Sequence, residues 1–89
     1  PRECALAQSL ADTSWRMRRL PALEMAIFAF GRTQFAGQFD REELAVRPGL
    51  IDLHTFLHYE KQIRNLQIQE GRLHRQFAKD SAELRQLQQ

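Results

Sequence analysis

The sequence predicts an all-α protein in which two long helices fold into an antiparallel, coiled-coil-like hairpin. Residues with high helix propensity fill most of the chain. Apolar residues recur at alternating spacings of three and four in both halves, which is the pattern of a helix that packs against another helix. Only three Pro and four Gly occur, mainly away from the C-terminal half. The whole of residues 1–89 is therefore predicted to form one helical hairpin domain.

The first helix is predicted over residues 3–35. Pro21 lies inside this range, and because proline lacks a backbone N–H, we expect a kink or a short break there. Gly31 and Gly37 bracket the expected C-terminus. One face of the helix carries a seam with two polar positions, which consists of Leu6, Leu10, Thr13, Met17, Leu20, Glu24 and Ile27.

The connection is predicted over residues 36–51. Asp40 has the chemistry of an N-cap, with Glu43 in the capping-box position, so one short helical turn is expected there. The Pro48-Gly49 pair predicts a turn. Four aromatic residues are expected to cluster at this closed end of the hairpin, namely Phe28, Phe30, Phe35 and Phe39.

The second helix is predicted over residues 52–87, with Asp52 as its N-cap. A helix of this length extends about 50 Å at 1.5 Å per residue. Folding the chain about the middle of the connection places Ile27 near Tyr59. The seam of the second helix consists of Phe56, Tyr59, Ile63, Leu66, Glu70, Leu73, Phe77, Asp80, Leu84 and Leu87.

The apolar faces of both helices are wide, so a single hairpin leaves apolar surface uncovered, and such surface marks an interaction site. The leading functional hypothesis is therefore a non-enzymatic interaction module. It associates with itself, completing a helical bundle as a homo-oligomer, or docks on a protein partner. The residues expected to carry this packing are Leu6, Leu10, Met17, Leu20, Ile27, Phe56, Tyr59, Ile63, Leu66, Leu73, Phe77 and Leu84.

Basic residues suggest an alternative function. Eleven of the thirteen are arginines, the residue suited to bidentate contacts with phosphate or carboxylate. Trp15 stands beside the densest cluster, and an indole next to guanidinium groups is able to stack on a base while the arginines bind phosphates. The competing interpretation is that these arginines pair with Glu24 or Glu70. The residues assigned to nucleic-acid binding are Trp15, Arg16, Arg18, Arg19, Arg64, Arg72 and Arg75.

Three carboxylates, Glu24, Glu70 and Asp80, occupy seam positions. Because an uncompensated buried carboxylate is costly, each is expected to find a partner or to lie at a hydrated edge. Polar residues in a seam also fix the register of the helices, which is the role expected for Glu70.

Sequence signals for catalysis are weak. The chain contains no glycine-rich phosphate loop and no nucleophile elbow. His54 and His58 share a helix face, so a small metal-dependent enzyme is a third hypothesis, but both are expected to be surface residues. Cys4 is the only cysteine and cannot form an internal disulfide. No metal, cofactor or small-molecule substrate is predicted, and the protein is not expected to be an enzyme.

The longest apolar run, residues 25–30, is far shorter than the roughly 20 residues that a membrane span requires. The N-terminal residues also lack the layout of a signal peptide. We therefore expect a soluble, cytoplasmic protein without a membrane partner.

Two stretches resemble a known family. The first is Trp15-Arg16-Met17-Arg18-Arg19, which is followed by Glu24. The second is Tyr59-Glu60, in a Leu-rich helix that ends in Glu83-Leu84-Arg85-Gln86-Leu87-Gln88. Together they resemble the C-terminal helical part of an uncharacterised family of bacterial proteins with a WRxRR…E helix and a YE…EL..LQ helix. The resemblance implies a helical hairpin and a link to mobile or nucleic-acid-related systems, and it transfers no catalytic residue.

Overall fold

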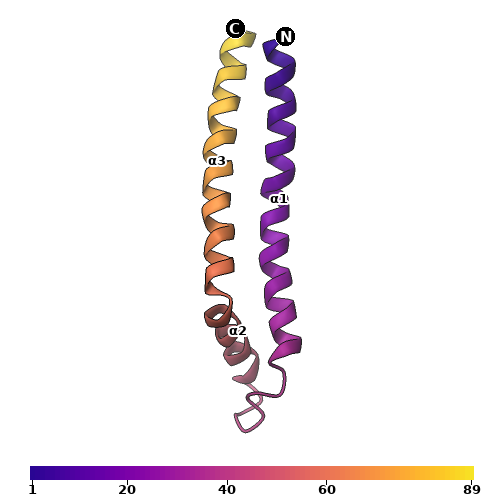
Figure 1. The fold of residues 1–89 in the computed structure, drawn as a ribbon, viewed down its shortest axis with the longest axis vertical. Coiled ribbons are helices and arrows are strands. Elements are labelled where there is room, and N and C mark those ends of the chain that lie inside the picture. Colours follow the sequence, from indigo (N-terminus) through magenta and orange to yellow (C-terminus); the bar gives the residue numbers. More distant parts are fainter. The chain divides into compact units, whose positions relative to one another are not determined.

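The computed structural model describes all 89 residues and contains three helices and no strand. These are α1 (Arg2–Gln34), α2 (Arg47–His58) and α3 (Glu60–Gln88), which follow one another in Figure 1. The prediction of an all-α helical hairpin is confirmed. The boundaries of the second half differ from those predicted, because α2 begins within the expected connection and a break at Tyr59 separates it from α3.

The helices are divided between two compact units. Unit 1 joins Pro1–Pro21 to Gln67–Gln89, and unit 2 consists of Ala22–Leu66. The boundary on α1 falls directly after Pro21. That residues 1–89 act as a single domain stays a prediction.

Unit 1 is an antiparallel pair of helical segments held by polar contacts. Arg2 donates from Nε and Nη2 to Glu83 Oε1, at 2.9 and 2.7 Å. Farther along, the Ser9 hydroxyl donates to Asp80 Oδ2 at 2.8 Å, and the Gln76 amide donates to Asp80 Oδ1 at 2.9 Å. Of the two residues of α1, Ser9 lies farther along the chain than Arg2, but its partner Asp80 precedes Glu83 in α3. This order is that of an antiparallel pair of helices.

Asp80 occupies a predicted seam position and is buried, with 4% of its surface exposed. The amide of Gln76 and the hydroxyl of Ser9 hydrogen-bond to its carboxylate and lower its pKa below the usual 3.8, although burial opposes them. The expectation that a seam carboxylate would find a partner is thus met at Asp80 by neutral donors. Glu70 instead lies half-buried, with an oxygen 3.7 Å from His74 Nε2 on its own helix.

Pro21 does not end the first helix. The helix α1 is continuous from Arg2 to Gln34, so of the two expected alternatives the break does not occur, and the kink stays a prediction. The proline removes the N–H that would have bonded to the carbonyl of Met17. Pro21 is exposed. Water can therefore reach this side of the helix and hydrate the unpaired carbonyl, which limits the cost of the lost bond.

The helix α1 ends at Gln34, between Gly31 and Gly37 as expected, but Gly31 itself is still helical and has a further role. The backbone N–H of Phe35 still donates to the Gly31 carbonyl at 2.8 Å, and no glycine in the chain has a positive φ. Gly31 is buried against Thr55, which is fully buried in α2. A Cβ on Gly31 would overlap the hydroxyl and methyl groups of Thr55 and lie 2.7 Å from its Cβ. The absence of a side chain at Gly31 therefore allows α1 and α2 to come close together at Thr55.

The connection is held by an arginine and not by a capping box. Asp40 and Glu43 lie in a series of turns, and no helix begins at Asp40. The Arg47 guanidinium donates to the backbone carbonyls of Glu42 and Asp40, at 2.8 and 2.6 Å. Arg47 also begins α2. Its side chain therefore ties the turns to the start of the helix.

The start of α2 also differs from the prediction. Its N-cap is Val46, which has no side-chain capping bond, and Pro48 lies in the first turn. Proline fits there because the first N–H groups of a helix have no intrahelical partner. The Pro48-Gly49 pair therefore begins a helix where a turn was expected. Asp52 lies inside α2 and accepts a hydrogen bond from Arg32 Nε at 3.2 Å, so it is an ion-pair partner and not the N-cap.

The break at Tyr59 changes which residues of α2 face inward. Tyr59 has φ −106° and ψ 24°, although its N–H still donates to the Thr55 carbonyl. Thr55 is fully buried, whereas Phe56, predicted to pack in the seam, is 40% exposed. The seam register assumed one unbroken helix. The small Gly31 admits Thr55 at the contact, so the face that carries Phe56 turns outward.

The other residues predicted to pack are buried or half-buried. In unit 1, Leu6 and Leu20 are buried, and Thr13 is a buried polar seam residue. In unit 2, Ile63 and Phe35 are buried. The half-buried members of the predicted set are Leu10, Met17, Ile27, Tyr59, Leu66, Leu73, Phe77 and Leu84.

Replacing Gly31 with Ala should destabilise the protein, because overpacking of a tight contact costs about 1–3 kcal/mol. Gly71→Ala is the matched control. A Cβ on Gly71 would lie 3.4 Å from Arg75 Nη1, the end of a flexible side chain. Alanine is favoured over glycine in a helix by about 1 kcal/mol, so Gly71→Ala should stabilise. Urea denaturation followed by circular dichroism measures both. Equal effects of the two substitutions would show that Gly31 is not under steric constraint.

The stability of the protein should fall in acid partly through Asp80. The pKa of Asp80 is lower in the folded state than its ordinary value of 3.8, so the ionised carboxylate stabilises the folded protein. This stabilisation is fully present at pH values above 3.8 and is lost as the pH falls through the lowered pKa of the folded state. Asp80→Asn should be less stable than the parent at pH 7, and the difference should shrink at pH values below 3.8. Melting temperatures across the pH range test this. A difference that does not vary with pH would contradict it.

Candidate functional site

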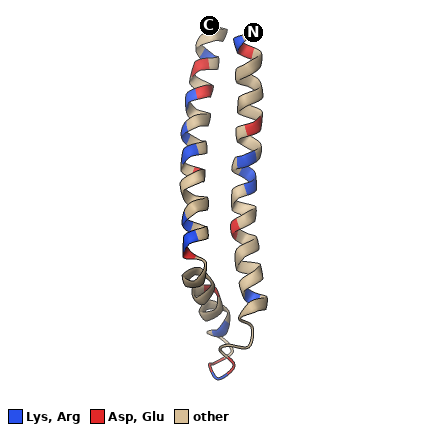
Figure 2. Cartoon of the chain, viewed as in Figure 1, with Lys and Arg blue, Asp and Glu red and all other residues tan.

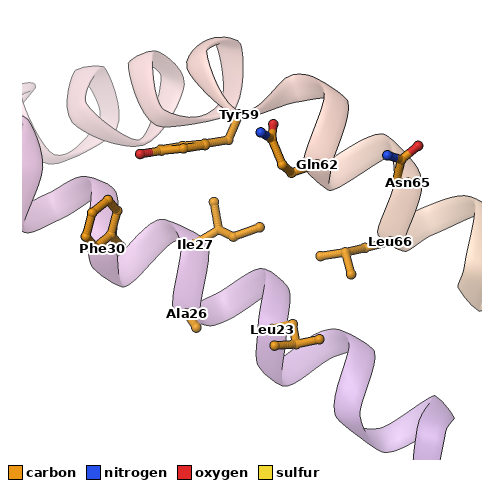
Figure 3. A pocket seen from close by; sticks show the side chains of 8 residues that line it. All are labelled: Leu23, Ala26, Ile27, Phe30, Tyr59, Gln62, Asn65 and Leu66. Carbon is orange, nitrogen blue, oxygen red and sulfur yellow. The ribbon is translucent and has the colours of Figure 1, made fainter.

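The clearest recess in unit 2 is an apolar groove of about 490 Å³. Figure 3 shows its two walls, one from α1 and the other from the start of α3 with Tyr59. The lining contains no charged side chain, and its two amides belong to Gln62 and Asn65. The residues that line the groove are Leu23, Ala26, Ile27, Phe30, Tyr59, Gln62, Asn65 and Leu66.

Helical spacing explains why these residues share a groove. The four residues from α1 follow one another at steps of three, one and three, which keeps them on one side of the helix. Ile27 and Tyr59, which the folded sequence pattern placed near each other, both line the groove. Five residues of the groove lining were not predicted site residues, namely Leu23, Ala26, Phe30, Gln62 and Asn65. Their signal is a strip of residues that runs beside the seam at helical spacing.

The wall at Tyr59 is fixed by two contacts. Its hydroxyl donates to Gln34 Oε1 at 2.5 Å. Its ring meets Phe30 edge to face, with centroids 6.3 Å apart and planes at 66°. Phe30 nevertheless remains 58% exposed and Leu23 39% exposed, so apolar surface of the groove is open to solvent. An apolar side chain from another molecule is the chemistry that such a surface accepts.

A second apolar surface of unit 2 lies on α2. Leu53, Phe56 and Leu57 are exposed at 54, 40 and 62%. They are spaced by three and one residues, so they share one face of the helix. We call these three residues the α2 face.

The histidines are partners of aromatic rings. Phe35 meets the rings of His54 and His58 edge to face, at centroid distances of 4.4 and 5.4 Å. Phe39 packs on His54 at 5.9 Å. Of the four phenylalanines expected to cluster, two thus pack with histidine, while Phe30 packs on Tyr59. His54 is half-buried, not a plain surface residue. No group of three or more His, Cys, Asp or Glu side chains gathers to hold a metal ion.

Unit 1 presents an exposed tryptophan among arginines. Trp15 is 55% exposed, and the guanidinium carbon of Arg19 lies 5.2 Å from the centre of its ring, in cation–π geometry. One shallow hollow is lined by Trp15, Arg18 and Arg19, and another by Asp12, Trp15 and Arg16. The indole therefore has guanidinium groups beside it in both hollows.

Arg16, Arg18 and Arg19 form no ion pair, which contradicts the expected pairing with Glu24 or Glu70. The four ion pairs of the structure involve Arg2, Arg32, Arg64 and His74. The three arginines are exposed. None of the three guanidinium groups is therefore held by a carboxylate at ion-pair distance.

The remaining predicted basic residues fall in different units. Arg64 lies in unit 2 and pairs with Glu60 on its own helix. Arg72 and Arg75 lie in unit 1 and are exposed without an ion pair. Of the predicted nucleic-acid-binding set, unit 1 therefore contains all except Arg64.

Charge is unequal between the units, as the colouring of Figure 2 allows the reader to follow. Unit 1 contains eight Lys or Arg and five Asp or Glu, a net charge of +3. Unit 2 contains five Lys or Arg and six Asp or Glu, which gives a net charge of −1. The net positive charge of the chain thus comes from the unit that carries Trp15, whereas the apolar groove and the α2 face belong to the other unit.

No protein-family model matches the chain, and searches of curated proteins and of solved structures find no similar protein. The resemblance to a bacterial family stays a prediction. None of the three helices is long and apolar enough to cross a membrane.

Proposed function

We propose that this chain is a non-enzymatic helical assembly module that pairs with a second copy of itself through unit 2. The observation that carries the proposal is the presence, in one unit, of an uncharged apolar groove and an exposed apolar helix face. The two surfaces are complementary, because an apolar groove binds the apolar face of a helix through residues at helical spacing.

Exposed apolar side chains support association. Phe30 in the groove and Leu53 and Leu57 on the α2 face are exposed at 58, 54 and 62%. Burying these side chains against a second copy removes their apolar surface from water, which is favourable.

The α2 face is short enough to lie within the groove. Leu53 and Leu57 are one helical turn apart, about 6 Å along α2. The α1 wall of the groove runs from Leu23 to Phe30, about two turns or 10 Å. In a two-fold dimer, the α2 face of each copy enters the groove of its partner, so the same contact is made twice. The apolar lining is then desolvated, while Gln62 and Asn65 remain able to hydrogen-bond.

Placing a charge on the α2 face should abolish this dimer. In Leu57→Asp, burial of the docking side chain would require burial of an unpaired carboxylate, which is strongly unfavourable. We expect the mass in solution to fall from two copies to one, with helical circular dichroism unchanged because Leu57 is 62% exposed. Light scattering coupled to size-exclusion chromatography measures the mass.

The control is Leu44→Asp, which introduces the same charge in the connection, where Leu44 is 76% exposed. This variant should remain dimeric. A parent protein that has the mass of one copy at every concentration would overturn the proposal. So would a Leu57→Asp variant that stays dimeric.

The docking mode has its own test. Ala26 is exposed in the groove, so Ala26→Arg should block the groove and leave a monomer. Mixing Ala26→Arg with Leu57→Asp leaves one intact groove and one intact α2 face, on different copies. We therefore expect a mixed dimer, weaker than that of the parent, in an equimolar mixture. If the mixture stays monomeric while each variant is folded, the α2 face does not dock in the groove.

A further inference from the structure

Trp15 and its neighbours have properties that self-association through unit 2 does not use. The indole is 55% exposed on a unit with a net charge of +3. Arg16, Arg18 and Arg19 have no carboxylate partner. Exposing a large aromatic side chain forgoes the gain from its burial, so the arrangement is best explained by a ligand that supplies both a flat ring and negative charge.

The position of Arg19 shows how such a ligand would sit. Its guanidinium carbon lies 5.2 Å from the indole centre, so it already occupies the place of a planar group over the ring. A base that stacks on the indole takes this place or the opposite face, and the displaced guanidinium is then free to bind a phosphate. Arg18 lines the same hollow, and Arg16 lines the second hollow beside the indole.

We propose that Trp15, Arg16, Arg18 and Arg19 form a binding site for single-stranded nucleic acid. The indole stacks on one base, and the three arginines bind the phosphates on either side. A single strand is favoured over a duplex because its bases can unstack from one another and present a free face, whereas the bases of a duplex are stacked within the helix. We call these four residues the Trp15 site.

Asp12 is the negative group of the second hollow, where it lies with Trp15 and Arg16. Its carboxylate accepts a hydrogen bond from the Gln8 amide at 3.1 Å and forms no ion pair. It therefore opposes a phosphate held in this hollow. Asp12→Asn should tighten binding a few-fold, an outcome that a purely structural role of the hollow would not produce.

The sole tryptophan of the chain provides the measurement. Because Trp15 is the only indole, its fluorescence should be quenched on addition of single-stranded oligo(dT). A duplex of the same length should quench it much less. In a salt series with the single strand, the logarithm of the binding constant should fall with a slope of about 2, since each of three neutralised phosphates contributes about 0.7.

Variants separate stacking from charge, with a labelled oligonucleotide and fluorescence anisotropy as the readout. Trp15→Leu should weaken binding about ten-fold, the usual loss for one stacked base. Arg18→Gln with Arg19→Gln should weaken binding and lower the salt slope. The matched control is Arg41→Gln with Lys61→Gln, which removes the same charge from exposed, unpaired residues of unit 2 and should bind as the parent does.

Three results would overturn the proposal. The first is the absence of binding at low salt, and the second is binding of oligo(dT) without any change in Trp15 fluorescence. The third is equal affinity for oligo(dT) and for inorganic polyphosphate, which has charge but no base. The fluorescence titration depends on unit 1 alone, and the mass measurements depend on unit 2. Failure of this site and failure of the proposed self-association are therefore distinguishable, and Leu57→Asp should keep the affinity for an oligo(dT) that is too short to reach two Trp15 sites.

Discussion

Unit 2 is organised by the contact between Gly31 and Thr55. The absence of a side chain at Gly31 lets α2 approach α1 until Thr55 is fully buried. The Thr55 hydroxyl meets its hydrogen-bonding requirement by donating to the Ile51 carbonyl at 2.7 Å, so it needs no partner across the contact. With Thr55 inside, Leu53, Phe56 and Leu57 are directed outward. The apolar face on which self-association is proposed is thus a consequence of a close approach between two backbones.

Unit 1 is held together by different means. Two donors of Arg2 to one oxygen of Glu83, together with the bond from the Ser9 hydroxyl to Asp80, join its two helical segments. Glu83 and Asp80 are therefore engaged away from the Trp15 site, whereas Asp12 lies beside it. The three arginines beside Trp15 form no ion pair. The proposed nucleic-acid site depends on this distribution of acidic partners.

The two proposed activities are thus separated within the chain. Apolar association uses the unit with a net charge of −1, where like charges do not oppose the approach of a second copy as strongly as in unit 1. Anion binding uses the unit with a net charge of +3. A homodimer that pairs through unit 2 would carry two Trp15 sites, and a flexible strand that reached both would be bound more tightly than by one.

The sequence by itself determined the helical class, the extent of the first helix and most of the apolar seam, because those features depend on local propensity and on spacing within one helix. It also singled out Trp15 and its arginines as a candidate cluster, because they all lie within residues 15–19. Tertiary structure alone decided that Gly31 is a contact residue and not a cap, that Thr55 and not Phe56 faces inward, and that Asp52 pairs with Arg32. Each of these depends on which atoms of a different helix come near, and no local pattern contains that information. The groove in unit 2 has the same origin, since its two walls come from segments that only folding brings together.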